Sequence, residues 1–396
     1  MSALRTDEAK YRYRDIVSSR GWPAWAVATI GSRLPVAMAP LALVLVGHEA
    51  SGGYAFGGLL VVAHTLGEAC AAPVAGTLVD KWSPRRMLAP CLAVEALLFV
   101  ALAVSVTADA PPAVLLATAA LAGAIPAGAP GGLRSTLTHV VGPAALPRAL
   151  SLDTVLNQAC WGLAPILASV TATLFSPTMT IALVAAIPAM GTVAALWLPR
   201  TPPHREDVAR TALWPLARLL GRSLLLTAVL RLLLGAMTVV APPLFESALS
   251  GVALGAYAIG TGLGSLLYSA RRTWPGSHEQ QADVCLALLG AVVVSCFFFQ
   301  GSTFLLCLYG LAGLLEGPVV LARSLHLERI LPADRRATGF SLQYAAIGWG
   351  FAAGGLVLAE TITTTPPHIV LAATGAAAAA IALLAFLLPS RIARRS

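Results

Sequence analysis

The sequence has few charged residues for its length. Acids and bases make up 11% of the 396 residues, whereas hydrophobic residues make up 57%. The 18 acids and 26 bases are too few to cover the surface of a soluble protein of this size. Lysine occurs only at Lys10 and Lys81, so arginine supplies most of the net charge of +8. These shortages exclude a soluble globular protein.

Cofactor and catalytic motifs are also missing. The sequence has no G-x-x-x-x-G-K-[ST] loop for nucleotide phosphates, no H-E-x-x-H metal motif and no G-x-S-x-G nucleophile motif. We therefore expect no ATP-driven reaction, no enzyme active site, and neither a metal nor another cofactor. The 6 cysteines all fall within apolar runs, where they fill space as small apolar residues and predict no disulfide framework.

Apolar runs of about twenty residues, each long enough to cross a hydrocarbon core as a helix, dominate the sequence instead. Short breaks separate these runs, so consecutive helices are expected to be antiparallel. The sequence therefore predicts an all-α polytopic membrane protein with twelve transmembrane helices. The expected helices lie near residues 22–46, 54–78, 88–107, 113–133, 149–174, 179–198, 222–246, 251–270, 282–300, 304–324, 338–360 and 367–389.

Basic residues occur on one side of these helices only. Both chain ends and the connections after the second, fourth, sixth, eighth and tenth helices carry Lys or Arg. The connections without Lys or Arg are 48–53, 108–112, 175–178, 247–250, 300–302 and 361–366. Because cytoplasmic loops are enriched in Lys and Arg, both termini are predicted to be cytoplasmic.

The cellular setting follows from composition. Residues 1–20 contain five basic residues and no apolar core, so we expect no signal peptide. The preference for Arg over Lys, with abundant Ala, Gly and Pro, is typical of a GC-rich bacterial genome. We therefore expect a multi-pass protein of a bacterial cytoplasmic membrane, in contact with membrane lipids, without a nucleic-acid partner, and acting as a monomer.

The two halves of the chain resemble each other. "RLPVAMA" from Arg33 lies 198 residues before "RLLLGAM" from Arg231, and Leu66-Gly67 matches Leu263-Gly264. These matches predict two pseudo-symmetric six-helix bundles, at 1–198 and 222–396, with a cytoplasmic linker at 199–221. The segment 208–222 fits an interfacial helix or a plain linker equally well. Such pseudo-symmetry places a site at mid-membrane between the halves.

One loop carries a family resemblance. "GTLVDKWSPRRML" resembles the signature loop of the major facilitator superfamily between its second and third helices, with Ser83 where a glycine is usual. The resemblance implies a cytoplasmic gating loop whose acid and bases latch the two halves and stabilise the outward-facing state. A plain solvated loop would explain the bases but not the glycine or the acid. The matching residues are Gly76, Leu78, Asp80, Lys81, Arg85 and Arg86.

Two further stretches refine the resemblance. In "WGLAPILAS", Ala164-Pro165 followed by Ala168-Ser169 resembles the fifth-helix element of the antiporters in this family, with small residues replacing its glycines. The stretch "SLDTVLNQACWGLAP" is similar to actinobacterial members, in which an acid stands at the position of Gln158. The fourth helix lacks the mid-membrane arginine of many proton-coupled drug exporters. The resemblance therefore favours export without fixing the proton path.

Ionisable residues near the middle of the predicted helices are the candidate coupling and cavity groups. Each ionised group facing lipid there costs roughly 2.5–3.5 kcal/mol, so these residues must be paired, protonated or hydrated. They are Arg33, His64, Glu68, Arg231 and Glu316, together with Glu95, which we expect to be structural.

The sequence is compatible with more than one partner for these ionisable residues. His64 and Glu68 are four residues apart and share a helical face, where an imidazole and a carboxyl can hold or pass a proton. The alternative is an Arg33–Glu68 bridge between adjacent helices. Glu316 is expected either to pair with Arg231 or to contact substrate directly. Two arginines facing one cavity would attract an anionic or zwitterionic compound.

Amides and aromatic rings on the fifth and eleventh helices are the candidate substrate wall. Amphipathic rings beside amides suit an organic substrate, although interhelical packing explains each residue equally well. The set comprises Asn157, Gln158, Trp161, Gln343, Tyr344 and Trp349.

The sequence thus predicts a secondary active transporter that exports an amphipathic organic compound, such as a drug or natural product, by proton antiport. Proton-coupled uptake of a small organic solute by symport is the main alternative. Two other classes remain: an intramembrane enzyme using His64 and Glu68, and a lipid-binding or sensory protein that transports nothing.

Overall fold

The computed structural model describes residues 13–81, 84–142, 145–199, 213–245, 247–271, 274–299, 301–331 and 336–388, which form helices without a strand. Twelve helices in these ranges are long and apolar enough to cross a membrane, as predicted. The elements are α2 (Tyr13–Val17), α3 (Trp22–Ser51), α4 (Tyr54–Lys81), α5 (Pro84–Thr107), α6 (Pro112–Ala124), η1 (Ile125–Gly128), α7 (Ala129–Val141), α8 (Leu146–Leu174), α9 (Pro177–Ala195), α10 (Leu213–Leu244), α11 (Ser247–Ala270), α12 (His278–Val294), η3 (Ser295–Phe297), α13 (Ser302–Ile330), α14 (Arg336–Thr361) and α15 (Pro367–Leu387).

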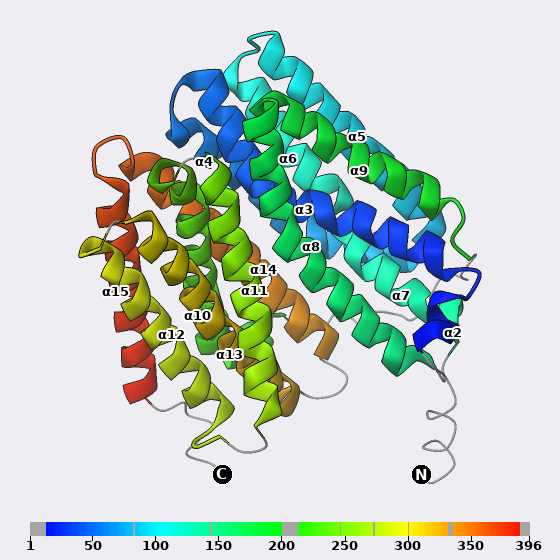
Figure 1. Cartoon of the computed structure of the whole chain (residues 1–396). Coiled ribbons are helices and arrows are strands. Elements are labelled where there is room, and N and C mark those ends of the chain that lie inside the picture. The colour runs from blue at the N-terminus through cyan, green and yellow to red at the C-terminus, as the bar shows by residue number, and fades with distance from the viewer. Residues whose placement is uncertain are drawn as a thin grey trace.

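The helices form two bundles, α3–α9 and α10–α15 (Figure 1). In the first, α3 packs on α8 and α9, α4 on α6, and α5 on α9. In the second, α11 packs on α13, α10 on α14, and α12 on both α13 and α15. The bundles meet mainly through α4 against α14 and α8 against α11, with a smaller contact between α3 and α10. The first of these interfaces contains the Glu68–Tyr344 contact considered below.

Several helices extend beyond the apolar runs. The capping box of Ser277 and Gln280 starts α12 four residues before the predicted run, because it satisfies the free N–H groups of the first turn. Helix α13 continues to Ile330, six residues past its predicted end. The predicted fourth helix is interrupted by η1, where the sequence "IPAG" includes Pro126, whose missing N–H disfavours regular α-helix. Helix α10 begins at Leu213, so residues 213–222 are helical and continuous with the seventh membrane helix, whereas 208–212 lie outside the described residues.

The sequence repeat has a structural counterpart. A Cβ on Gly67 would collide with the carbonyl oxygen of Ala120, where α4 crosses α6. In the second half, a Cβ on Gly264 would collide with the carbonyl oxygen of Leu314, where α11 crosses α13. The Leu-Gly pair common to both halves therefore marks equivalent close helix crossings, which only glycine allows.

The two halves approach closely at the end of the bundle that holds the connections without Lys or Arg, here called the Arg-free end. On α4, a Cβ at Gly58 would lie 3.0 Å from the Cβ of Ala359 on α14. On α11, a Cβ at Gly251 would collide with Ser169 and with the carbonyl oxygen of Pro165 on α8. Backbones are thus in near contact across both interfaces, and the halves are closed together at this end.

Candidate functional site

Arg33 on α3 forms an ion pair with Asp153 on α8. Its Nη1 lies 2.7 Å from Asp153 Oδ1 and also donates to the Asp153 carbonyl oxygen at 3.1 Å. The two side chains are 10% and 7% exposed, so the charges neutralise each other largely out of solvent. The expected Arg33–Glu68 bridge is therefore wrong, because Arg33 faces α8 whereas Glu68 faces α14.

Glu68 instead connects the two halves. Its Oε1 accepts a hydrogen bond of 2.7 Å from the hydroxyl of Tyr344 on α14. Next to it, a Cβ on Gly348 would lie 2.5 Å from the Cβ of Ala69, so the two helices are in close contact here. Tyr344 remains 41% exposed. Glu68, a predicted coupling residue, is thus hydrogen-bonded directly to Tyr344, a predicted residue of the substrate wall.

His64 lies one turn before Glu68 but has different neighbours. It is 2% exposed, and its ring centroid is 6.0 Å from that of Phe99. Nδ1 is 3.2 Å from the carbonyl oxygen of Ala119 on α6 and must carry the proton, since a carbonyl oxygen only accepts. His64 Nε2 is buried without a hydrogen-bond partner in the described part of the chain.

The second half holds the expected pair between Arg231 and Glu316. Arg231 Nη1 on α10 lies 2.9 Å from Glu316 Oε1 on α13, which confirms the pairing. Thr261 on α11 donates its hydroxyl to Glu316 Oε2 at 2.8 Å. The Glu316 side chain is 2% exposed, so this carboxylate joins three helices. A small cavity beside the pair is lined by Thr227, Leu230, Arg231, Val320, Arg323, Gln343 and Ile347.

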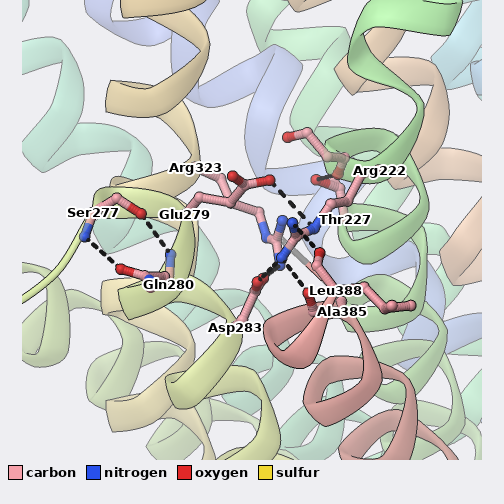
Figure 2. Close-up of polar contacts among 10 residues, drawn as sticks. Arg222, Thr227, Ser277, Glu279, Gln280, Asp283, Arg323, Ala385 and Leu388 are labelled. Carbon is pink, nitrogen blue, oxygen red and sulfur yellow. Dashed lines mark hydrogen bonds and ion pairs between the residues drawn. The ribbon is translucent and has the colours of Figure 1, made fainter. Parts of the chain in front are cut away.

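A second charged cluster in the same half escaped the sequence analysis (Figure 2). Asp283 on α12 is 0% exposed and lies between two arginines. Its Oδ2 is 2.5 Å from Arg222 Nη2 on α10, and its Oδ1 is 3.2 Å from Arg323 Nη2 on α13. Glu279 Oε1 lies 3.2 Å from Arg222 Nε. The two acidic side chains, Glu279 and Asp283, thus balance the positive charges of Arg222 and Arg323.

Arg222 also holds the last helix. Its Nη2 donates to the carbonyl oxygen of Ala385 at 2.6 Å, and its Nη1 donates to that of Leu388 at 3.0 Å. These carbonyls lie at the end of α15, where helical carbonyls lack a partner. One guanidinium therefore ties α10, α12 and α15 together (Figure 2).

Gln158, a candidate wall residue of α8, lies at the other interface between the halves. Asn157 Nδ2 donates to Gln158 Oε1 at 3.3 Å. A Cβ on Gly262 of α11 would lie 3.6 Å from Gln158 Nε2, so this amide faces the opposite half. Trp161 and Trp349 are 41% and 53% exposed, whereas Gln343 is 8% exposed and lines the cavity beside Arg231.

The predicted gating loop is described in part. Gly76, Asp80 and Lys81 lie in the last two turns of α4, and their side chains fall outside the described residues. Arg85 Nη1 donates to the carbonyl oxygen of Leu198 at 3.4 Å, just beyond the end of α9. Arg86 is exposed. In its described part, the loop thus contacts the end of α9, which belongs to the same half of the protein.

The sequence matches the family model of the Major Facilitator Superfamily over residues 25–277, which is more than half of the chain. The chain belongs to this superfamily. The fold and the family indicate a membrane transporter rather than an enzyme. Among curated proteins, no sequence matches this superfamily member significantly. Within the described residues, no group of three or more His, Cys, Asp or Glu side chains is placed to hold a metal ion.

Solved structures share the architecture of this superfamily member over nearly its whole length. The nucleoside transporter NupG matches with a TM-score of 0.71 and 14% identity, covering 92% of this chain and 97% of its own. A peptide transporter POT in complex with sulfate matches with a TM-score of 0.72 and 12% identity, covering 99% and 98%. An autoinhibited POT family peptide transporter matches with a TM-score of 0.73 and 13% identity. At such identities, the likeness concerns the fold alone.

Proposed function

We propose that this superfamily member exports an amphipathic organic compound, such as a drug or natural product, by proton antiport across a bacterial cytoplasmic membrane. Transport uses alternating access, in which the two halves rock about a central site. Both termini face the cytoplasm, and the protein acts as a monomer. The observation that carries the proposal is the hydrogen bond between Glu68 and Tyr344, which joins a titratable group to the opposite half.

Protonation of Glu68 changes the strength of this bond. An ionised carboxylate accepts a charge-assisted hydrogen bond, which is roughly twice as strong as a bond between neutral groups. With Glu68 ionised, the Tyr344 bond holds α4 against α14 and favours closure at the Arg-free end. Protonation weakens the bond, and a substrate with a basic or hydroxyl group competes with Tyr344 for the same carboxylate. Competition between proton and substrate for one group is the requirement of antiport.

The remaining candidate residues have supporting roles in this proposal. The pairs Arg33–Asp153 and Arg231–Glu316 keep cavity charges neutral until substrate arrives. Gln158, Trp161 and Trp349 contribute the wall that contacts the apolar body of the substrate. The gating loop, through Asp80 and the neighbouring bases, stabilises the outward-facing state by contacts at the cytoplasmic ends of the helices.

Export rather than uptake is favoured by the packing of α8. The fifth-helix element with Pro165 and Ser169 lies against Gly251 of α11, so small residues occur where the resemblance to antiporters requires close packing. Symport of a small organic solute is the second candidate. The solved structures with this fold include a nucleoside transporter and peptide transporters, which makes those compound classes the first to test for uptake.

The test is accumulation of a panel of fluorescent or radiolabelled compounds in an efflux-deficient bacterium. Cells expressing the wild type, Glu68→Gln or Tyr344→Phe are compared, with and without a protonophore. Glu360→Gln is the matched control, because Glu360 is exposed at the end of α14. We expect lower accumulation with the wild type and the control, and loss of this effect with Glu68→Gln or the protonophore. Higher accumulation than with empty vector would establish uptake instead.

A further inference from the structure

A cavity that the proposed mechanism does not use lies inside the second half, where α10, α13 and α14 approach one another. Arg231 of α10 and Arg323 of α13 both line it. Gln343 of α14 adds an amide, and the rest of the wall is aliphatic apart from Thr227. No acidic side chain of the described residues is part of this wall. The cavity therefore has two positively charged residues around it and no negatively charged one.

Each of these two arginines has a buried N–H group without a partner. The Nε atoms of Arg231 and Arg323 are inaccessible to solvent and form no hydrogen bond within the described part of the chain. The Arg323 side chain as a whole is 3% exposed. Buried donors on charged groups are rarely left unpaired in native structures, because their desolvation is costly. The two Nε–H groups therefore require an acceptor that the described side chains do not supply.

The acidic partners of the two arginines are bound through other nitrogens. Glu316 lies against Nη1 of Arg231. Asp283 lies against Nη2 of Arg323 and is shared with Arg222 (Figure 2). An arginine has five N–H donors, so an ion pair through one terminal nitrogen leaves further donors available. Ion pairing thus orients both guanidinium groups without satisfying their Nε–H groups.

The size of the cavity limits the nature of the missing acceptor. Its volume is about 20 Å³, and about 10–15 Å³ suffices for one water-sized sphere. A chloride ion is only slightly larger than a water molecule, whereas an organic anion such as gluconate is far too large. Water must also donate its own two hydrogens, whereas an anion only accepts. Two cationic N–H groups and an amide that can turn its N–H₂ inward favour the anion.

We propose that this cavity is a binding site for a small monovalent anion of chloride size. The anion accepts charge-assisted hydrogen bonds from Nε of Arg231 and Nε of Arg323, and a further bond from the Gln343 amide. Helix α13 makes little direct contact with α10 or α14, so the anion joins three helices that otherwise pack weakly here. The site does not involve the Glu68–Tyr344 bond and is independent of the proposed function.

The test is chloride binding to the purified full-length protein, which needs no substrate. Saturable binding of radioactive chloride is measured together with the melting temperature in detergent, while chloride is replaced by gluconate at constant ionic strength. We expect saturable binding, and a melting temperature that is higher by at least about 2 °C in chloride or bromide than in gluconate. Constant ionic strength excludes general charge screening as the cause.

Two variants locate the site. Arg323→Lys keeps a positive charge beside Asp283 but lacks the Nε–H group, so chloride should bind about tenfold more weakly. The matched control is Arg329→Lys, an exposed position on the same helix, which should bind chloride like the wild type. If Arg323→Lys does not fold, Gln343→Glu serves instead. Its carboxylate takes the place of the anion, so the protein should bind no chloride and melt at the same temperature in chloride and gluconate.

Two results would overturn the proposal. Wild-type protein that shows no saturable chloride binding and equal melting temperatures in chloride and gluconate would show that the cavity holds water only. Chloride binding that is unchanged in Arg323→Lys or in Gln343→Glu would place the bound anion elsewhere on the protein. Neither result depends on transport, so the proposed function stands or falls separately, by the accumulation experiment.

Discussion

Asp283 is the residue on which the charged cluster of the second half depends. It is fully buried, and it bonds both Arg222 and the nearly buried Arg323. Removal of one partner from a buried ion pair costs about 3–5 kcal/mol, because the other charge stays buried without compensation. Asp283 is therefore expected to contribute to stability rather than to substrate binding.

We predict that Asp283→Asn lowers the free energy of unfolding by about 3–5 kcal/mol, seen as a clear drop in melting temperature in detergent. The control is Asp109→Asn at an exposed turn with φ of 48°, a conformation that Asn tolerates as well as Asp. The control should leave the melting temperature unchanged. Equal melting temperatures for Asp283→Asn and wild type would contradict this account of the cluster.

Residue-level analysis of the sequence identified some charges and missed others for one physical reason. Arg231 and Glu316 lie well inside apolar runs, and their pairing is confirmed. Asp153, Asp283 and Arg323 lie near the ends of the predicted runs, so a search for ionisable residues in the middle of the runs did not select them. The helices extend farther than the runs, from Leu146 in α8 and to Ile330 in α13, so these charges are inside the bundle. Partner choice, as for Arg33, depends on helix rotation, which spacing alone does not determine.

At the scale of elements, the interface of α8 and α11 is set by glycines. A side chain at Gly251 would overlap Ser169 and the Pro165 carbonyl at the closed end. Overpacking of this kind costs typically 1–3 kcal/mol in a state that keeps the helices together. A state in which the halves separate there avoids the overlap.

We predict that Gly251→Leu shifts the protein toward opening at the Arg-free end. In a cysteine-free background, a cysteine at Ser169, which is 0% exposed, should react about tenfold faster with a membrane-impermeant maleimide when Gly251 is leucine. Gly301→Leu is the control, because a Cβ at Gly301 meets nothing within 4 Å. An unchanged reaction rate in Gly251→Leu would show that this contact does not keep the end closed.

Element boundaries were less predictable than element number. The capping box at Ser277 and Gln280 adds polar residues to α12 that an apolar run cannot reveal. Helix α3 continues through Pro35 and Pro40, whereas the stretch at Pro126 becomes η1, so a proline in the sequence does not by itself locate a break. Neighbouring helices decide which interruptions are tolerated.

At the scale of the whole molecule, orientation is the property most directly testable. The connections at one end carry no Lys or Arg, and those at the other carry many. We predict that a reporter active only in the cytoplasm works at both termini, whereas one active only after export works at 108–112 and 361–366. Activity of the exported reporter at either terminus would reverse the assigned topology.

The whole-molecule fold could be predicted because it depends on repeated, redundant features. Twelve apolar runs and an internal repeat specify helix number and pseudo-symmetry, and solved structures share this architecture at 12–14% identity. The candidate site depends on single contacts, such as Tyr344 with Glu68, that join residues far apart in sequence. Twelve apolar runs are compatible with many different sites, so the substrate does not follow from them.

The bonds of Arg222 also have a consequence for how the protein is made. During synthesis, Arg222 enters the membrane 61 residues before Asp283 and 163 residues before Ala385. The guanidinium therefore lacks two of its partners, the carbonyl oxygens of Ala385 and Leu388, until α15 has been synthesised. Insertion of α15 is then the step that completes these bonds, and a nascent chain stalled before it exposes an incompletely bonded arginine that membrane quality control can recognise.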